Sequence, residues 1–182
     1  MKQKVACFFI FYFLISTVGY SQISKGFWVF GGSGSLSSGG ATTNNLIFKS
    51  TSVNIKPRGG YFFIDKLATG LSFNYFFQKS SSGGPSTTTN GIGLGPFVRY
   101  YFLPTDKRVN VLAEVYGTYS TQIKSKVGVF EYGLTGGVAI FLNSSVALEI
   151  LPGFQSFREK NSRSNYFITQ IGLQVHLEKD KE

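Results

Sequence analysis

The feature that most constrains the fold is a two-residue alternation of side chains on both sides of a polar break at Asp65–Lys66. In residues 59–77, GGYFFIDKLATGLSFNYFF, one series of alternate positions is apolar apart from Thr69, and it consists of Tyr61, Phe63, Leu67, Leu71, Phe73, Tyr75 and Phe77. The residues between them are mostly small or polar. Successive side chains of a strand point to opposite faces of a sheet, so this pattern predicts a β-hairpin with one apolar face and one mixed face.

The rest of the chain repeats this pattern in short segments. Apolar residues recur at every second position rather than at helical spacing, and Gly residues stand inside the segments, which disfavours helix. The expected strands are 25–34, 51–63, 67–78, 91–103, 108–122, 130–142, 146–157 and 165–177. The chain is therefore predicted to be all-β, with eight antiparallel strands.

The polar breaks between these strands alternate in length. The short breaks are 64–66, 104–107 and 143–145, and the long ones are 35–50, 79–90, 123–129 and 158–164. Transmembrane β-barrels show this alternation, because they have short periplasmic turns and longer extracellular loops. The Gly- and Ser-rich stretch 31–40 lacks the Lys-Ser/Thr pair of a phosphate-binding loop, and we interpret it as a strand end followed by a flexible loop.

Alternation by itself does not say which face points inward. A soluble lipocalin-like barrel would place the apolar face inside, around a ligand. Three features favour lipid on the apolar face instead. The mixed face carries few charges, the segments are long enough for the roughly 9–11 residues that cross the hydrocarbon, and aromatic residues gather beside the short turns like a membrane-interface girdle. These aromatic residues are Tyr61, Phe63, Tyr100, Phe102 and Phe141.

A strand edge cannot stay open in hydrocarbon, because its backbone groups would lack hydrogen-bond partners. The sequence therefore predicts an eight-stranded antiparallel up-and-down transmembrane β-barrel.

Residues 1–21 have the pattern of a secretory signal peptide. Lys2 and Lys4 precede an uncharged, apolar-rich run at 5–18, which is shorter than the roughly 20 residues of a membrane-spanning helix. Small residues before position 22 place the expected cleavage after Ser21.

Residues 22–182 then form the barrel domain. Cys7 is the only cysteine and belongs to the signal peptide, so the exported chain is expected to contain no disulfide.

Four stretches resemble a known family, the small outer-membrane β-barrel proteins of Gram-negative bacteria (the OmpA/OmpX-like, "porin family" class). They are FWVFGGSGSLSS (27–38), GGYFFIDKLATGLSFNY (59–75), GLGPFVRYYFLPTDK (93–107) and VLAEVYGTYS (111–120). The resemblance extends in order over the whole exported chain. It implies export to the cell outer membrane, contact with outer-membrane lipid, and insertion by the outer-membrane assembly machinery. Gln170, Gly172, Val175 and Leu177 are similar to the last-strand signal that this machinery reads.

Signals for catalysis are poor. His176 is the only histidine, and we interpret it as a hydrogen-bonded polar group on the lumen side near the periplasmic end. Too few ligands are present for a metal site. The sequence thus predicts no catalytic residue, no metal and no cofactor.

The basic residues are dispersed, although the full chain has a formal net charge of +9. This dispersion does not favour nucleic-acid binding. Six cations lie in or beside the expected extracellular loops: Lys79, Lys124, Lys126, Arg158, Lys160 and Arg163. They are either ordinary solvated charges or contacts to lipopolysaccharide phosphates.

Six charged residues fall on the mixed face of the strands, three of each sign. They are Lys56, Arg58, Arg99, Glu114, Glu131 and Glu149. We interpret them as a structural ion network, because a crowded lumen must pair its charges, with a gate or proton path as the alternative. Arg99 and Glu114 flank the same turn and are expected to pair. Glu131 is expected to be only partly enclosed.

Taken together, the sequence predicts a monomeric, non-enzymatic outer-membrane barrel with a structural or surface-interaction role. A narrow, porin-like pore is the first alternative, although the interior of an eight-stranded barrel is just wide enough for side chains to fill. A soluble lipocalin-like ligand binder is the second. The sequence does not identify a loop partner.

Overall fold

The computed structural model describes residues 23–43, 46–160 and 162–178. The predicted signal peptide, with Cys7 and the cleavage site after Ser21, lies outside the described residues.

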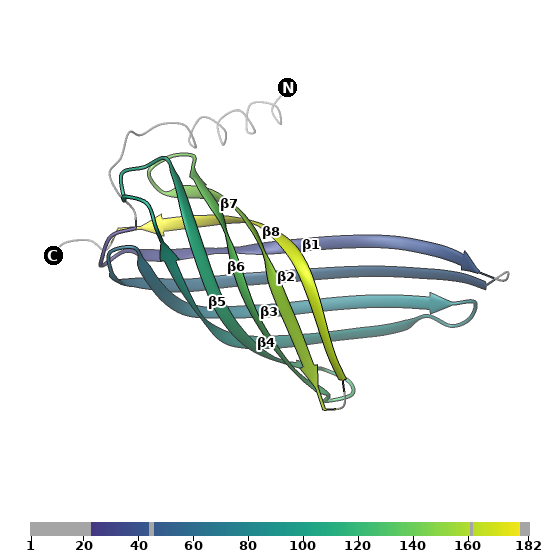
Figure 1. Ribbon diagram of the computed structural model, residues 1–182. Helices are drawn as coiled ribbons and strands as arrows, with labels where there is room; N and C mark the ends of the chain where they lie inside the picture. The colour runs from purple at the N-terminus through teal and green to yellow at the C-terminus, as the bar shows by residue number, and fades with distance from the viewer. Residues whose placement is uncertain (1–22, 44–45, 161, 179–182) are drawn as a thin grey trace, which may run out of the picture.

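The described residues form eight strands that close into one antiparallel barrel, in which each strand pairs with its sequence neighbour and β1 pairs with β8 (Figure 1). The strands are β1 (Trp28–Thr43), β2 (Leu46–Ile64), β3 (Leu67–Ser82), β4 (Thr87–Tyr101), β5 (Val109–Gln122), β6 (Gly128–Phe141), β7 (Val146–Glu159) and β8 (Ser162–Leu177). The prediction of an eight-stranded up-and-down barrel is confirmed. No helix in the described part of the chain has the length and hydropathy to cross a membrane.

The apolar face of the strands is the outer face of the barrel. In β4, Leu94 and Val98 are exposed, whereas Phe97 and Arg99 between and beside them are almost fully buried. Leu134 on β6 is 56% exposed and Ile171 on β8 is 58% exposed. The predicted orientation, with the mixed face around the lumen, is therefore confirmed.

An apolar cluster closes the lumen at the end with the short turns. Ile23, Phe62, Tyr101 and Leu112 are among its buried members. The segment before β1 is held against this end because the Lys66 amide donates to the Ile23 carbonyl at 2.8 Å. Phe141 packs against the same cluster from inside the barrel.

The placement of Phe141 in an outer aromatic girdle is thus wrong. That interpretation used its nearness to a turn, whereas alternation along β6 puts odd-numbered residues on the inner face. Phe63, Tyr100 and Phe102 are exposed on the outside as expected, and Tyr61 is half-buried between Trp28 and Phe63.

The expected long loop at 35–50 is wrong. β1 continues to Thr43 and β2 begins at Leu46, so the Gly- and Ser-rich stretch 31–40 is strand throughout. Antiparallel pairing uses backbone groups and therefore does not need apolar side chains. Cross-strand hydroxyl contacts accompany it, since Ser37 Oγ lies 2.7 Å from Ser52 Oγ. The break at 79–90 is likewise shortened, because β3 extends to Ser82 and β4 begins at Thr87.

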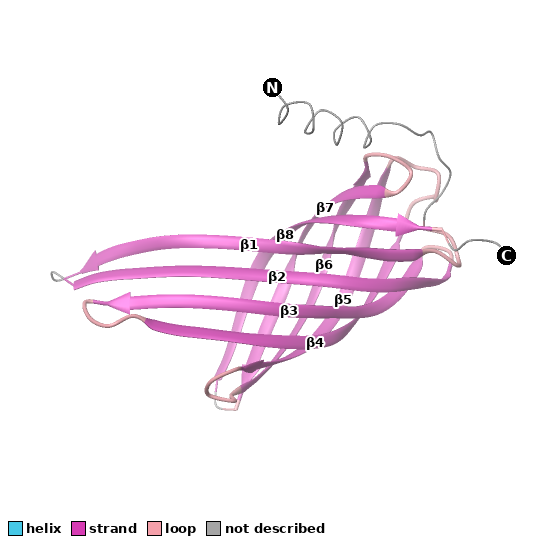
Figure 2. Ribbon diagram, turned by 180° about the vertical axis from the view of Figure 1, so that it is seen from behind, coloured by secondary structure: helices cyan, strands magenta, loops and turns pink. Residues whose placement is uncertain are grey.

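β1 and β8 separate from each other at the end of the barrel with the longer loops. Figures 1 and 2 show β1–β4 running together in one direction while β5–β8 turn away from them. The pairing of β1 with β8 runs only from Trp28–Leu177 to Ser33–Gly172, although both strands continue beyond these residues. The barrel is therefore closed at the turn end and open between β1 and β8 at the loop end, whereas β4 and β5 stay paired as far as Gly91–Gln122.

Candidate functional site

The charged side chains in the lumen form the most distinctive polar cluster of the protein. Arg99 and Glu114 lie directly opposite each other on β4 and β5. The Arg99 Nη2 donates to Glu114 Oε2 at 2.6 Å, and its Nε donates to the same oxygen at 2.9 Å. Both residues are at most 2% exposed. This pair follows from local alternation, because each residue occupies an inward position beside the same turn.

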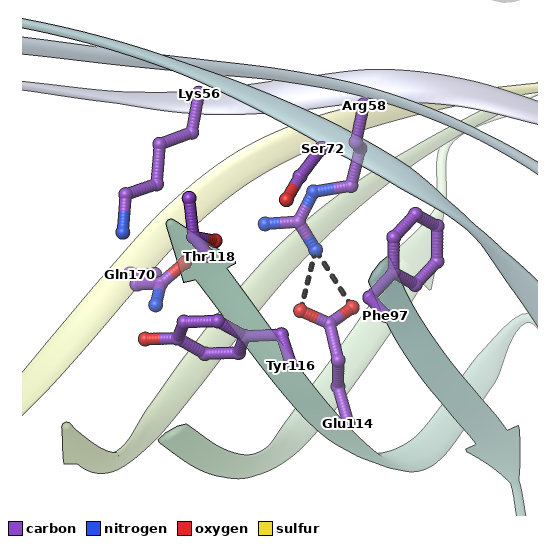
Figure 3. Close-up of a pocket in the computed structure, with 8 residues that line it drawn as sticks. All are labelled: Lys56, Arg58, Ser72, Phe97, Glu114, Tyr116, Thr118 and Gln170. Carbon is purple, nitrogen blue, oxygen red and sulfur yellow. Dashed lines mark hydrogen bonds and ion pairs between the residues drawn. The ribbon is translucent and has the colours of Figure 1, made fainter. Parts of the chain in front are cut away.

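Glu114 also receives a second arginine from across the lumen. The Nη1 atom of Arg58, on β2, donates to both carboxylate oxygens of Glu114 at 2.7 Å (Figure 3). The guanidinium lies 5.6 Å from the centre of the Phe97 ring, which covers one side of it. One carboxylate thus holds two buried arginines from two different strands.

Arg99 in turn joins a second carboxylate. Its Nη1 donates to Glu149 Oε1, on β7, at 2.6 Å. The Tyr101 hydroxyl donates to the same oxygen at 3.2 Å. Glu149 is 1% exposed, so the full length of this chain of contacts from Arg58 to Glu149 is withdrawn from solvent.

Lys56 and Glu131 form a separate pair further from the short turns. The Lys56 ammonium donates to Glu131 Oε1, and the side-chain amide of Gln155 donates to the same oxygen. Glu131 is 2% exposed, so the expectation that it would be only partly enclosed is wrong. It is enclosed because β2 and β7 bring side chains over it from two sides.

The structure thus brings all six predicted charged residues into the lumen. Arg58, Arg99, Glu114 and Glu149 form one connected group, and Lys56 with Glu131 forms the other. Sequence reasoning did not name Tyr101 or Gln155 as members. Alternation along β4 and β7 puts both on the inner face, and that signal could have identified them.

The lumen charges balance, since three cations meet three anions. Between the two groups lies a void of about 10 Å³, lined by residues that include Lys56, Arg58, Glu114 and Gln170 (Figure 3). Such a volume holds about one water molecule. The arrangement can therefore cross-brace the barrel, and it leaves little space for a solute.

His176 lies in an aromatic enclosure at the turn end. It is 1% exposed and packs against the rings of Phe62, Tyr101 and Phe141, with ring centres 5.4–6.4 Å away. Neither ring nitrogen has a hydrogen-bond partner among the described residues. The hydrogen-bond partner that the sequence predicts for His176 is therefore not found among the described side chains, and the ring contacts are aromatic.

The six cations that the sequence places in or beside the longer loops fall into two groups. Lys124, Lys126 and Lys160 lie in the connections between strands, whereas Lys79, Arg158 and Arg163 lie within β3, β7 and β8. All six are exposed.

Two of these cations meet at one tyrosine. Arg158 and Arg163 are cross-strand neighbours on β7 and β8. The Arg158 guanidinium lies 5.4 Å from the centre of the Tyr132 ring, and Arg163 Nη2 donates to the Tyr132 hydroxyl at 3.3 Å.

The four residues of the predicted assembly signal lie along β8, with Val175 and Leu177 on the outer face. Among the β8 residues that pair with β1, Gly172 is the one furthest from the short turns. A Cβ atom at Gly172 would lie 2.7 Å from the Gly32 carbonyl oxygen, so this glycine allows the two strands to approach closely.

No group of three or more potential metal ligands occurs in the described ranges.

Comparisons with known proteins support the fold. No protein-family model matches the chain, and no curated protein matches it in sequence. A solved structure that is similar is the outer membrane protein OprG from Pseudomonas aeruginosa. The two share 13% sequence identity over 90% of this chain and 100% of that chain, with a TM-score of 0.55. This likeness shows that the chain has the fold of an outer-membrane β-barrel.

Proposed function

We propose that this protein is a non-enzymatic barrel of the Gram-negative outer membrane, with a structural or surface-interaction role. The observation that carries the proposal is the inverted distribution of side chains. Apolar residues such as Leu94, Leu134 and Ile171 cover the outside, and the ion pairs lie inside. In water this distribution would expose a continuous apolar belt, whereas in a bilayer it places each side chain in a suitable solvent. The fold of OprG agrees with it.

The test is cell fractionation followed by gel electrophoresis with and without boiling. We expect the protein to enter the outer-membrane fraction, to need detergent for extraction, and to migrate anomalously until it is boiled, because a closed barrel resists unfolding by the detergent of the gel. Recovery in the soluble periplasmic fraction would contradict the proposal and would favour the lipocalin-like alternative.

The narrow-pore alternative has less support from the geometry. The lumen contains two ion-paired groups, and the void between them holds about one water molecule. We expect no steady conductance in planar bilayers at the level of general porins. A stable open current that is lost in an Arg99→Ala variant would instead support a pore through the ion network.

For the surface role, the loop end of β6–β8 offers a phosphate-binding arrangement. Like charges placed directly opposite each other on neighbouring strands repel and destabilise the pair. Arg158 and Arg163 are such a pair, and Tyr132 holds both guanidinium groups on the outer face. An anion bound between the two arginines would offset their mutual repulsion. A guanidinium group can donate two parallel hydrogen bonds to the oxygens of one phosphate. Lipopolysaccharide phosphates are the anions at this level of an outer membrane.

The test is lipopolysaccharide retention through detergent purification. We expect an Arg158→Gln/Arg163→Gln double variant to lose most of the lipopolysaccharide that co-purifies. Lys79→Gln, on the opposite half of the barrel, serves as the control and should retain it. Equal retention in all three proteins would contradict this role for the arginine pair.

A further inference from the structure

A cleft opens in the barrel wall where β1 and β8 stop pairing. Its lining comes from Ser33, Gly34 and Ser35 on β1 and from residues 168–171 on β8. Ser33 belongs to the last register pair, Ser33–Gly172, and the other lining residues lie directly beyond it. The cleft has a volume of about 270 Å³, close to the lower end of the roughly 300–1,000 Å³ of small-molecule sites. We name it the lateral cleft.

The lateral cleft lies at the height of the apolar belt. Leu36 on one edge is 75% exposed on the outer face, and Phe167 and Ile171 on the other are 65% and 58% exposed. If the β1–β8 register continued past Ser33–Gly172, Leu36 would face Thr169, between these two residues. In a membrane the cleft therefore opens toward lipid rather than toward water.

The two edges of the cleft present backbone groups without a strand partner. Beyond Ser33–Gly172, no register pair joins β1 to β8 within the described ranges. Backbone N–H and C=O groups at membrane depth need hydrogen-bond partners, and they are tolerated there only where protein or a polar cavity supplies them. An occupant with polar atoms would satisfy this requirement.

The inner wall of the cleft is polar and rich in donors. Asn54 and Lys56 on β2, Gln155 on β7 and Gln170 on β8 line it together with Ser35. Lys56 is paired with Glu131, but an ammonium group has three N–H donors, so it can also bind an acceptor in the cleft. Its side chain keeps 12% of its surface exposed.

The cleft ends at the ion network. Lys56 and Gln170 line both the lateral cleft and the water-sized void beside Arg58 and Glu114. Because that void is only about 10 Å³, a group that enters from the side can reach Lys56 but cannot continue through the lumen. The geometry is that of a binding site and not of a passage.

We propose that the lateral cleft binds one membrane lipid, which enters sideways from the bilayer. Its phosphate or ester oxygens accept hydrogen bonds from Lys56, the side-chain amides and the free backbone N–H groups at the strand edges. Its acyl chain lies outside the cleft along Leu36, Ile171 and Phe167. This inference rests on the membrane location proposed above.

The experiment uses native mass spectrometry of the detergent-purified barrel with lauroyl lysophosphatidylglycerol as the probe. Ser35→Trp places a large side chain in the cleft. Ser80→Trp is the matched control, because Ser80 lies on β3 and lines a different hollow near the loop tips. We expect one bound lipid in the natural protein and in Ser80→Trp, and about tenfold weaker binding in Ser35→Trp, a loss of about 1.4 kcal/mol.

A second variant closes the cleft instead of filling it. A continued register would pair Ser35 with Gln170, so a Ser35→Cys/Gln170→Cys disulfide in a Cys7→Ser background would draw the two edges together. We expect oxidation to abolish lipid binding and reduction to restore it. Unboiled gel migration verifies that each variant is a folded barrel.

Equal lipid binding by all variants would overturn the proposal, since it would show adsorption elsewhere on the belt. Glycerol phosphate that competes as well as the lipid would also overturn it, because the site would then recognise a soluble anion. If the protein fractionates with the outer membrane but binds no lipid, only the proposal of lipid binding in the lateral cleft is contradicted. A protein found in the soluble fraction contradicts the proposed function itself.

Discussion

Removing the Glu114 carboxylate is the most direct test of the ion network. Glu114 accepts two hydrogen bonds from Arg58 and two from Arg99, at 2.6–2.9 Å. Glu114→Ala would leave the Arg58 charge without the carboxylate that it contacts, inside a lumen where Arg58 is 9% exposed. Arg99 would keep Glu149, at 2.6 Å.

Breaking a buried ion pair by removing one partner typically costs roughly 3–5 kcal/mol. With an m-value of about 2 kcal/mol per M urea, this loss lowers the midpoint of unfolding by about 2 M. We expect a shift of this size for Glu114→Ala in detergent micelles. Trp28 is the only tryptophan and lies on the outer face of β1, so its fluorescence reports the loss of the folded barrel.

The second mutation distinguishes the two arginines. Among the described residues, the ion pairs of Arg58 all go to Glu114, whereas Arg99 is shared between Glu114 and Glu149. Adding Arg58→Ala to Glu114→Ala removes the uncompensated charge and should recover a large part of the loss. Adding Arg99→Ala instead should recover less, because Glu149 would then lose its partner.

The result that would refute this reasoning is additivity. If the Glu114→Ala/Arg58→Ala protein shows the plain sum of the two single losses, the side chains do not interact in the folded barrel. Glu114→Gln separates charge from shape, since it keeps the acceptor oxygen and the volume. It should lower the midpoint less than Glu114→Ala does.

Three further predictions concern the barrel wall. Leu134→Arg, on the outer face, should make the free energy of insertion less favourable by about 2–4 kcal/mol in a vesicle-folding assay, while Thr88→Arg, at the loop end of β4, should fold normally. Equal effects of the two changes would mean that the membrane-spanning region is assigned wrongly. Gly95→Ala should destabilise the barrel by about 1–3 kcal/mol in urea, because its Cβ would clash with backbone atoms of β5, whereas Gly39→Ala, with open space around it, should be neutral. Gly172→Val should lower the yield of folded barrel in outer membranes without changing the amount synthesised, because the side chain would force β8 away from β1. An unchanged yield would contradict the role of Gly172 in closing the barrel.

The number of strands, their order and the two faces of each strand can be predicted from the alternation in the sequence. These properties depend on a two-residue period, which is local and does not depend on the partner strand. The break at Asp65–Lys66 is the turn between β2 and β3, and Arg99 and Glu114 meet because alternation and one turn place them opposite each other. Phe141 also follows the alternation of β6, which places it on the inner face, whereas its nearness to a turn points wrongly to the outer aromatic girdle.

Two features depend on how the strands are arranged in space: which inward side chains meet across the lumen, and where the barrel wall stays open. The contact between Arg58 and Glu114 joins residues 56 positions apart on strands that are not neighbours, so it depends on the curvature of the closed sheet. The ends of β1 and β2 depend on backbone hydrogen bonds, which Ser- and Gly-rich segments can also form. The seam between β1 and β8 ends at Ser33 and Gly172, because the two strands diverge beyond these residues and their backbone groups no longer meet. No local pattern encodes that divergence, and the lateral cleft results from it.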